Sequence, residues 1–438
     1  MKIKFYFIFW AYILVLGLPQ SSFAQRFPVI IQGNVLDAET NKPIQNVNVF
    51  LSGTTVGTST GPNGKYTIRD SVLAGKYSLV YSHVGYNTQA KELMIVQENT
   101  LQEDTLKVDM LLIPKQNTLS EVVVKAKKDL VWQKQLQVFQ REFLGTSSMG
   151  KQCKILNPWV LSFTQSRDTL LASAPKEVIV ENQALGYKIY CDLVAFHHVN
   201  FFTTYLAYYR FEALEPQNSK QARKWNKARL QAFYGSFRHF SIALLHHRLK
   251  KEGFKIKYSK LSPEAYTPEQ PLTPIQPQKL HSKNHIILPD YLSITYRKRE
   301  EMEFIKSIIS QGKKIRARAR FSRALPQNSW ISIKGGKLKV SDLGLILDNP
   351  LKLQTYGYWA WQRVGNRLPT GFIPERLNQA IQLSKIGKVK QLQRYVQRHP
   401  QEKVYLHQDK PYYALGDTVW VSGYVVQAQN HRPSHLSR

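Results

Sequence analysis

Short runs in which apolar and polar residues alternate dominate residues 26–115. Turns rich in glycine, proline and asparagine separate these runs, the clearest of which lie at 29–31, 47–51, 66–68 and 77–81. Strands this short at this spacing predict a β-sandwich of about seven strands. The side chains predicted to be buried or half-buried in it are Val35, Val47, Val49, Phe50, Ile68, Leu79 and Tyr86.

Residues 129–395 combine helical and strand-like patterns. A helix is predicted where Trp132, Leu136, Phe139 and Phe143 recur every three or four positions, ending at Gly145. A second helical stretch covers 219–252, with a kink or split at Gly235-Ser236 and an end at Gly253. Its apolar stripe consists of Phe233, Phe237, Phe240, Leu244 and Leu245.

The strand-like runs of this middle region complete a predicted α+β domain. They lie at 160–163, 178–181, 187–195 and 203–211, and the last two are predicted to pair as an aromatic-rich hairpin. Five prolines within 262–284 mark a linker or a long exposed loop. Beyond it the sequence predicts a hairpin over 330–340 around Gly335-Gly336 and a strand over 353–361.

The first domain carries a set of motifs that can be compared with a known family. These are Gly33-x-Val35-x-Asp37, Pro43-Ile44 before Val47 and Val49, the turn Gly61-Pro62-Asn63-Gly64 before Tyr66, and Val84-Gly85-Tyr86. They resemble the carboxypeptidase-regulatory-like domain, a transthyretin-type sandwich. The resemblance implies a non-catalytic module of the kind found at the N-termini of outer-membrane receptors. Residues 119–124 resemble the stretch that leads into the plug of energy-coupled (TonB-dependent) receptors, which implies association with a receptor or transporter.

The C-terminal segment resembles the opening of a macroglobulin-type β-sandwich. The matching residues are Tyr405-Leu406, Asp409-Lys410-Pro411-Tyr412 and Gly416-Asp417-x-Val419. Residues 403–438 hold two or three strands of such a domain, too few to close a sandwich. We therefore expect an incomplete domain and a truncated form of a longer protein. The alternative is that residues 419–426 complete the sheet of the middle domain.

The first 24 residues have the order of a secretory signal peptide. Lys2 and Lys4 precede an apolar run at 5–18, and Ser22-Phe23-Ala24 supplies small residues for cleavage between Ala24 and Gln25. The run is shorter than the ~20 residues that span a bilayer, which disfavours the alternative of a membrane anchor. The sequence predicts export to the periplasm or outer membrane of a Gram-negative cell, with the mature chain soluble or peripheral to the membrane.

The charge of the chain limits the kinds of binding partner that we expect. The formal net charge is +31, concentrated at 220–260 and 297–323. Nucleic acid is disfavoured because an exported protein meets little of it. Envelope proteins, or an anionic lipid or glycan surface, are the expected partners, while the alternative is that these residues are ordinary solvated faces. Cys153 and Cys191 leave two alternatives open, one disulfide or two buried free thiols.

Patterns that look catalytic lose that meaning in context. Ser59 lies in a GxSxG string, but between two strands rather than before a helix. His399 and Glu402 have zinc-peptidase spacing, yet too little chain follows for a peptidase core. The sequence has no phosphate-binding loop and no dinucleotide fingerprint, so we predict no catalytic residue, metal or cofactor.

Three hypotheses about function remain. The leading one is a non-enzymatic envelope protein that acts as a binding or assembly module. The second is a carbohydrate-binding protein, in which Tyr205, Tyr208 and Tyr209 of the aromatic hairpin stack on sugar rings. Against it, the same tyrosines fit the core of a sheet. The third is a hydrolase with an unrecognised site in the middle domain.

Overall fold

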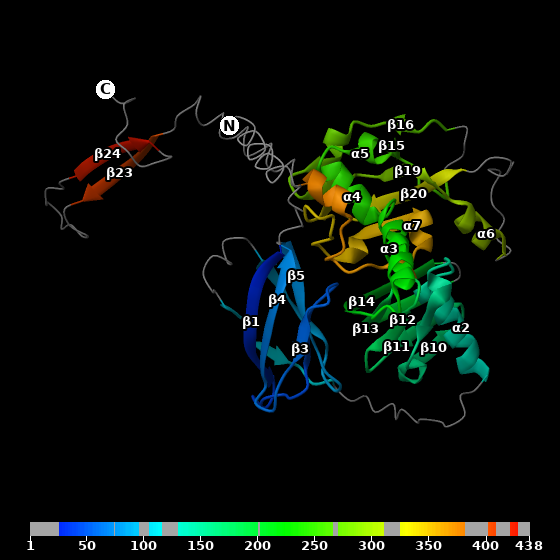
Figure 1. Ribbon diagram of the computed structural model, residues 1–438, viewed down its shortest axis with the longest axis horizontal. Coiled ribbons are helices and arrows are strands. Elements are labelled where there is room, and N and C mark those ends of the chain that lie inside the picture. Colours follow the sequence, from blue (N-terminus) through cyan, green and yellow to red (C-terminus); the bar gives the residue numbers. More distant parts are fainter. Residues whose placement is uncertain are drawn as a thin grey trace, which may run out of the picture. The chain divides into compact units, whose positions relative to one another are not determined.

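The computed structural model describes residues 26–95 without 74, residues 105–115, residues 130–381 without 200–201, 266–269 and 311–324, and two strands at 402–408 and 421–427 (Figure 1). The chain divides into two compact units, one of residues 23–374 and one of residues 1–22 with 375–438. The fold is mainly β with an α+β middle, as predicted from the sequence.

Two four-stranded sheets make up the N-terminal sandwich. In the first, β1 pairs with β4 on one side and with β7 and then β8 on the other. In the second, the order is β3-β2-β5-β6. The bounds are β1 (Arg26–Asp37), β2 (Asn48–Leu51), β3 (Gly57–Ser59), β4 (Lys65–Leu73), β5 (Gly75–Ser82), β6 (Gln89–Ile95), β7 (Thr105–Lys107) and β8 (Met110–Leu112).

The core of the sandwich lies between these sheets. The side chains predicted to be buried are confirmed: six are buried and Tyr86 packs half-buried against them. Gly33 is required because a Cβ there would lie 2.0 Å from the carbonyl oxygen of Val108. The Asp37 carboxylate accepts hydrogen bonds from the amides of the following turn and from the Tyr86 hydroxyl, 2.7 Å away. The motifs of this domain therefore hold its turns and its closest backbone contacts.

The middle region begins with α2 (Leu130–Leu144), which covers a six-stranded sheet. Phe139 and Phe143 are fully buried against that sheet, and Gly145, with φ of 90°, ends the helix as predicted. The predicted hairpin is confirmed, because β13 and β14 pair from end to end apart from one bulge between Leu193 and Ala195. The strands are β9 (Cys153–Ile155), β10 (Ser162–Ser166), β11 (Thr169–Ser173), β12 (Val178–Asn182), β13 (Tyr187–Val199) and β14 (Phe202–Ala213).

Three helices follow, where the sequence predicted one split stretch: α3 (Ser219–Phe233), α4 (Phe237–Leu245) and α5 (Leu249–Glu252). Gly235 has φ of 79° at the predicted break, and the Ser236 hydroxyl caps α4 by accepting from the amide of His239. Gly253, with φ of 93°, ends α5. The predicted apolar stripe packs inward, with Phe240 and Leu244 fully buried.

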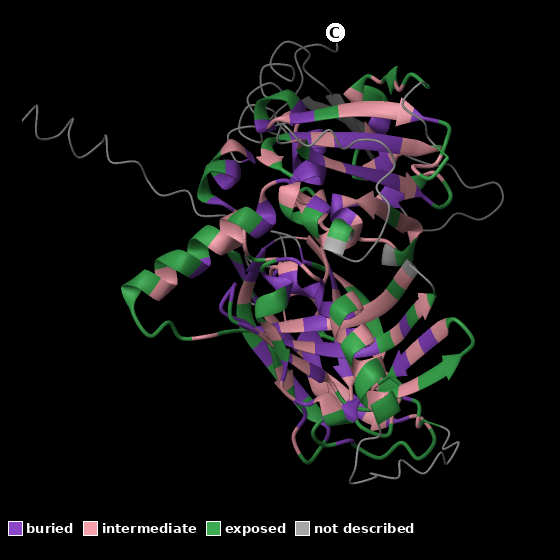
Figure 2. Ribbon diagram, turned by 90° about the vertical axis from the view of Figure 1, so that its right-hand side faces the viewer, coloured by how far each residue is buried: buried purple, intermediate pink, exposed green. Residues whose placement is uncertain are grey.

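A five-stranded sheet, ordered β16-β15-β19-β20-β22, and a small sheet of β17, β18 and β21 form the second core of the middle region. Figure 2 shows the alternation of buried and exposed positions along the strands. The strands are β15 (Phe254–Ser259), β16 (Thr273–Pro274), β17 (His281–Ser282), β18 (His285–Ile287), β19 (Tyr291–Glu300), β20 (Pro326–Ile333), β21 (Lys337–Lys339) and β22 (Leu353–Gly357). The short helices are α6 (Met302–Ser310) and α7 (Tyr358–Trp361).

Of the two alternatives for the proline-rich segment, the structure has the long loop: apart from Leu280, its described residues are exposed or half-buried, and it joins two strands of one sheet. Two other predictions for this region were wrong in detail. The turn at Gly335-Gly336 does not close a hairpin, because β20 pairs with β19 and β22 whereas β21 pairs with β18. The strand predicted over 353–361 ends at Gly357, where φ is 68° and α7 begins.

A short turn of the sandwich joins it to the middle region. The amide of Gly53 donates to the Tyr209 carbonyl (2.6 Å), and the amide of Phe211 donates to the Thr54 carbonyl (2.8 Å). Gly53 also accepts a hydrogen bond from the amide of Thr370, 2.7 Å away. The turn thus extends the edge of β14 through main-chain hydrogen bonds, which depend little on side chains.

In the other unit, residues 375–381 are helical, and β23 (Glu402–Gln408) pairs antiparallel with β24 (Val421–Gln427). These strands coincide with the predicted strand-forming runs at 404–407 and 419–426. The macroglobulin-type resemblance and the truncation stay predictions.

Candidate ligand-binding cavity

A cavity of about 820 Å³ lies within residues 23–374. Its walls come from β5 and β6 of the sandwich, from β14, from residues 344–349 and from residues 362–370. Its volume falls within the ~300–1,000 Å³ of typical small-molecule sites. Two regions that are far apart in the sequence therefore share one cavity.

Strand β14 brings all three predicted stacking residues, Tyr205, Tyr208 and Tyr209, to this cavity. They do not form one flat platform, because neighbouring residues of a strand face opposite sides, so Tyr208 faces away from the other two. Tyr209 is 5% exposed, and the ring of Tyr205 packs edge-on against Phe143 at 5.2 Å. The alternative that these tyrosines serve the sheet core describes Tyr205 and Tyr209 well.

Two arginines that sequence reasoning missed cover these rings. The guanidinium carbon of Arg367 lies 4.2 Å from the ring centre of Tyr209, and that of Arg363 lies 6.0 Å from the ring centre of Tyr205. Both arginines line the cavity. A guanidinium over an aromatic ring is attracted by the ring's electron-rich face. Tyr205 and Tyr209 therefore orient the two arginines, and the arginines occupy the ring faces on which a sugar would stack.

The turn that carries both arginines, η6 (Val364–Asn366), is firmly held. The Asn182 side-chain amide donates to the Gly365 carbonyl at 2.9 Å, and the Ser147 hydroxyl donates to the Asn366 side chain at 2.8 Å. A Cβ on Gly365 would lie 2.5 Å from the Cα of Gly150, so only glycine allows this close approach. The two guanidiniums are thus positioned before any ligand arrives.

The carboxylates in the cavity wall are already neutralised. Glu92 forms an ion pair with Lys76, and Asp348 forms one with Lys352 at 2.8 Å. Within the described part of the chain, Arg363 and Arg367 form no ion pair. The wall therefore carries an excess of positive charge.

Arg238 has a structural role in the same wall. Its guanidinium donates to the carbonyl oxygens of Leu343, Pro369 and Thr370. Burial lowers the pKa of Arg238 to about 10, which still leaves the side chain charged at neutral pH. Arg238 holds two wall segments together and adds to the positive field.

The electrostatics around Arg367 favour its charged form. Arg367 is an exposed residue, and although partial desolvation of its guanidinium would lower its pKa, the adjacent Tyr209 and Tyr205 side chains raise that pKa above its ordinary value. Burial raises the pKa of Tyr209 far above its ordinary value, so this hydroxyl stays protonated. No described protein atom accepts or donates a hydrogen bond at the Tyr209 hydroxyl. A buried hydroxyl of this kind needs water or a ligand as its partner.

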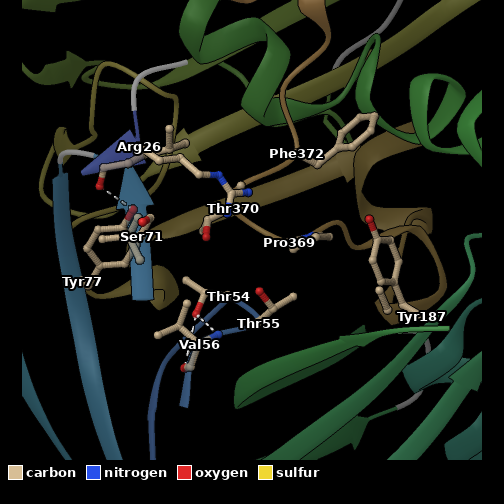
Figure 3. A pocket seen from close by; sticks show the side chains of 14 residues that line it. Arg26, Thr54, Thr55, Val56, Ser71, Tyr77, Tyr187, Pro369, Thr370 and Phe372 are labelled. Carbon is tan, nitrogen blue, oxygen red and sulfur yellow. Dashed lines mark hydrogen bonds between the residues drawn. The ribbon is translucent and has the colours of Figure 1, made fainter. Parts of the chain in front are cut away.

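A smaller cavity of about 250 Å³ lies beside the first and shares Tyr77 and Thr370 with it. Figure 3 shows the Arg26 side chain reaching into it towards Thr370, with Thr54 and Tyr187 on other walls. Its boundary includes the turn that joins the sandwich to β14. It therefore widens the space between the two regions.

The remaining candidates from the sequence lie elsewhere. Cys153 and Cys191 lie on β9 and β13, with β12 between them. Cys191 is buried and Cys153 half-buried, and the choice between one disulfide and two free thiols stays a prediction. Ser59 lies on β3, where its hydroxyl donates to the Asn48 side chain at 3.2 Å. Ala24, Gln25, His399 and residues 119–124 lie outside the described residues.

Within the described residues, no three His, Cys, Asp or Glu side chains are grouped as a metal site would require. No helix described by the structure is long and apolar enough to cross a membrane.

Comparison with protein families identifies the first domain. Residues 31–124 match the CarboxypepD_reg-like domain. This confirms the resemblance drawn from the glycine and turn motifs. The family is a non-catalytic module with an immunoglobulin-like fold. A comparison with curated proteins gives no match.

Solved structures give weak similarities. A pilus 2b backbone protein of group B streptococcus is 17% identical with a TM-score of 0.17, over 20% of this chain and 41% of that one. A candidate membrane-associated protein of unknown function from Bacteroides fragilis is 14% identical with a TM-score of 0.17, over 38% and 66%. A candidate carbohydrate-binding protein from Bacteroides uniformis is 10% identical with a TM-score of 0.14, over 42% and 99%. This chain thus spans less than half of the streptococcal protein, and similarities this low carry no argument about function.

Proposed function

We propose that this protein is a non-enzymatic, exported envelope protein that binds a saccharide in the large cavity. The observation that carries the proposal is the cavity itself, about 820 Å³ with walls from both the sandwich and the middle region. Binding sites are commonly found where two such regions meet. The family match of residues 31–124 supports a binding role for the sandwich, since that module is non-catalytic.

The chemistry of the walls suits a saccharide. Sugars need many hydrogen bonds together with some apolar contact. The wall offers hydroxyls from Ser52 and Ser78, a side-chain amide from Gln362, and apolar surface from Phe237 and Trp359. The Tyr209 hydroxyl adds a polar group without a protein partner. A sugar hydroxyl could satisfy it directly or through water.

Export and assembly complete the proposal. Cleavage between Ala24 and Gln25 would deliver the chain to the periplasm or outer membrane, and N-terminal sequencing of the mature protein tests it. The macroglobulin-type segment and the receptor-like stretch at 119–124 favour a partner protein in the envelope. Crosslinking in an envelope fraction, followed by mass spectrometry, identifies that neighbour. A mature chain that starts at Met1 would contradict export.

Filling the cavity tests the binding site. Ala90 is exposed on β6 and lines the cavity, whereas Lys91 is exposed on the same strand and lies outside the wall. We expect purified protein to bind members of a glycan array, Ala90→Trp to abolish that binding, and Lys91→Trp to retain it. Binding that survives Ala90→Trp would place the site elsewhere. Release of reducing sugar from a bound glycan would contradict the non-enzymatic part and favour a hydrolase.

A further inference from the structure

We infer that the saccharide is acidic and that Arg363 and Arg367 bind its carboxylate or phosphate groups. This inference rests on the proposed saccharide-binding function and specifies the chemical class of the ligand. Its basis is a pair of arginines in the cavity wall that lack an acidic partner within the described residues.

The charge balance of the wall favours an anionic ligand. A lysine pairs with each of the two wall carboxylates, Glu92 and Asp348, so neither is free to neutralise the arginines. Burial raises the pKa of Glu142, but the hydrogen bond and charge of Arg141 lower it below its ordinary value, with a smaller contribution from Arg363. Glu142 pairs with Arg141 at 2.8 Å and accepts from the Thr203 hydroxyl. An anion entering the cavity would therefore meet two cations that still need a counter-charge.

The geometry of the two arginines suits a carboxylate or a phosphate group. Their guanidiniums lie over Tyr205 and Tyr209, which restricts their orientation. A guanidinium presents a planar set of donors that matches the two oxygens of a carboxylate or phosphate. Because the turn between the arginines is fixed by Asn182 and Ser147, little conformational freedom is lost when the ligand binds.

The surroundings strengthen this recognition. Charged Arg238 lies in the same wall, and its pKa of about 10 keeps it protonated at neutral pH. Interactions between charges in a partly enclosed cavity are stronger than in open water. A neutral saccharide would leave these cations without compensation. The cavity therefore selects by charge, while its hydroxyls and amides contact the sugar ring.

The alternative is that the arginines only cover the tyrosine rings and stabilise the sheet. Both roles predict that removing an arginine affects the protein. They differ in what happens when the protein is left intact and the charge of the ligand is changed. The deciding experiment therefore begins with wild-type protein and matched ligands.

Oligogalacturonate, oligoalginate and sialyllactose provide the acidic probes, each compared with its methyl ester. Phosphorylated oligomannose, compared with oligomannose, provides the phosphate probe. We expect at least one acidic probe to bind at least about tenfold more tightly than its neutral form, as measured by calorimetry. The affinity of the acidic form should fall as salt rises from 50 to 500 mM, about a threefold shortening of the screening length, while that of the neutral form stays constant.

Variants then assign the charge recognition to the two arginines. We expect Arg363→Gln and Arg367→Gln each to weaken the acidic probe about tenfold to a hundredfold and to leave the neutral form unchanged. Arg223→Gln, which removes the same charge from an exposed position on α3, is the matched control and should change neither. Arg367→Lys keeps the charge but loses the planar donor set, so an intermediate loss is expected.

The outcomes separate the two proposals. If neutral forms bind as tightly as acidic ones, the inference fails while saccharide binding stands. If no glycan binds in any form, both fail. If the acidic preference is present in wild type but persists in both glutamine variants, charge recognition lies elsewhere and the assignment to Arg363 and Arg367 is overturned.

Discussion

The sandwich and the middle region are held in place by different kinds of contact. In the sandwich, backbone segments approach so closely that only glycine fits, as at Gly33 against Val108 and at Gly64 against Val35. The middle region has such approaches too, as at Gly365 against Gly150, but there polar side chains also tie together segments far apart in the sequence, as Asn182 does with Gly365. The close backbone approaches depend on glycines and turns that recur as motifs. The side-chain contacts depend on single polar residues, and in the middle region they position the arginines of the cavity.

The largest effect is expected where the sandwich is most tightly packed. Gly33→Ala would place a Cβ 2.0 Å from the Val108 carbonyl oxygen, so the backbone must move. We expect the free energy of unfolding of the sandwich to fall by about 3 kcal/mol. Gly61→Ala is the control, because its Cβ would meet no atom closer than 3.6 Å.

Tryptophan fluorescence makes this test specific to one region. Six of the eight tryptophans lie between residues 130 and 374, and none lies within 26–115. Urea unfolding followed by circular dichroism should show an earlier transition in Gly33→Ala, while the tryptophan transition moves less. Equal shifts of the two signals would show that both regions unfold as one, which would contradict separate stabilisation of the sandwich and the middle region.

A smaller effect is expected from the polar contact that holds the arginine turn. Asn182 is fully buried, and its side chain donates to Gly365 and accepts from the amide of Leu185 at 3.0 Å. Asn182→Ala leaves a buried carbonyl and a buried amide without partners, which costs about 2 kcal/mol. The tryptophan transition should report this loss. Exposed Asn226→Ala, on α3, is the control and should stay within about 0.5 kcal/mol of wild type. A negligible loss in Asn182→Ala would mean that the turn is held mainly by packing around Val364.

The same difference explains what could be predicted from the sequence. Strand alternation and turn glycines identified the sandwich and its core, and helical spacing placed α2, α3 and α4. Periodicity also found the β13–β14 hairpin, because both strands are long and aromatic-rich. These signals are local, within a few residues of each other.

The cavity could be predicted only in part. The three tyrosines were identified, but as stacking surfaces. Local sequence predicts the strand that carries them, but not which distant residues pack against it. Arg363 and Arg367 reach them from a turn more than 150 positions later, and among 61 lysines and arginines nothing in their local sequence distinguishes them. The turn at Gly335-Gly336 failed for a similar reason, since the strands on either side of it pair with distant partners rather than with each other.

The smallest effect concerns the two thiols of the middle sheet. Burial raises the pKa of Cys153 to about 12 and that of Cys191 further, so a thiol with the pKa of Cys153 is ionised in only about one molecule in ten thousand at pH 8. Since the thiolate is the form that reacts, native protein should not react with Ellman's reagent over minutes. After unfolding, two thiols per chain should react in wild type and one in Cys153→Ser. The unfolding midpoint of Cys153→Ser should stay close to that of wild type, because the Cys153 thiol makes only a weak contact with the Met149 carbonyl at 3.4 Å. Unfolded wild type without reactive thiols would mean that the exported protein forms the disulfide. In that case the strand between the two cysteines, β12, would have to move, and the middle sheet would differ from the one described.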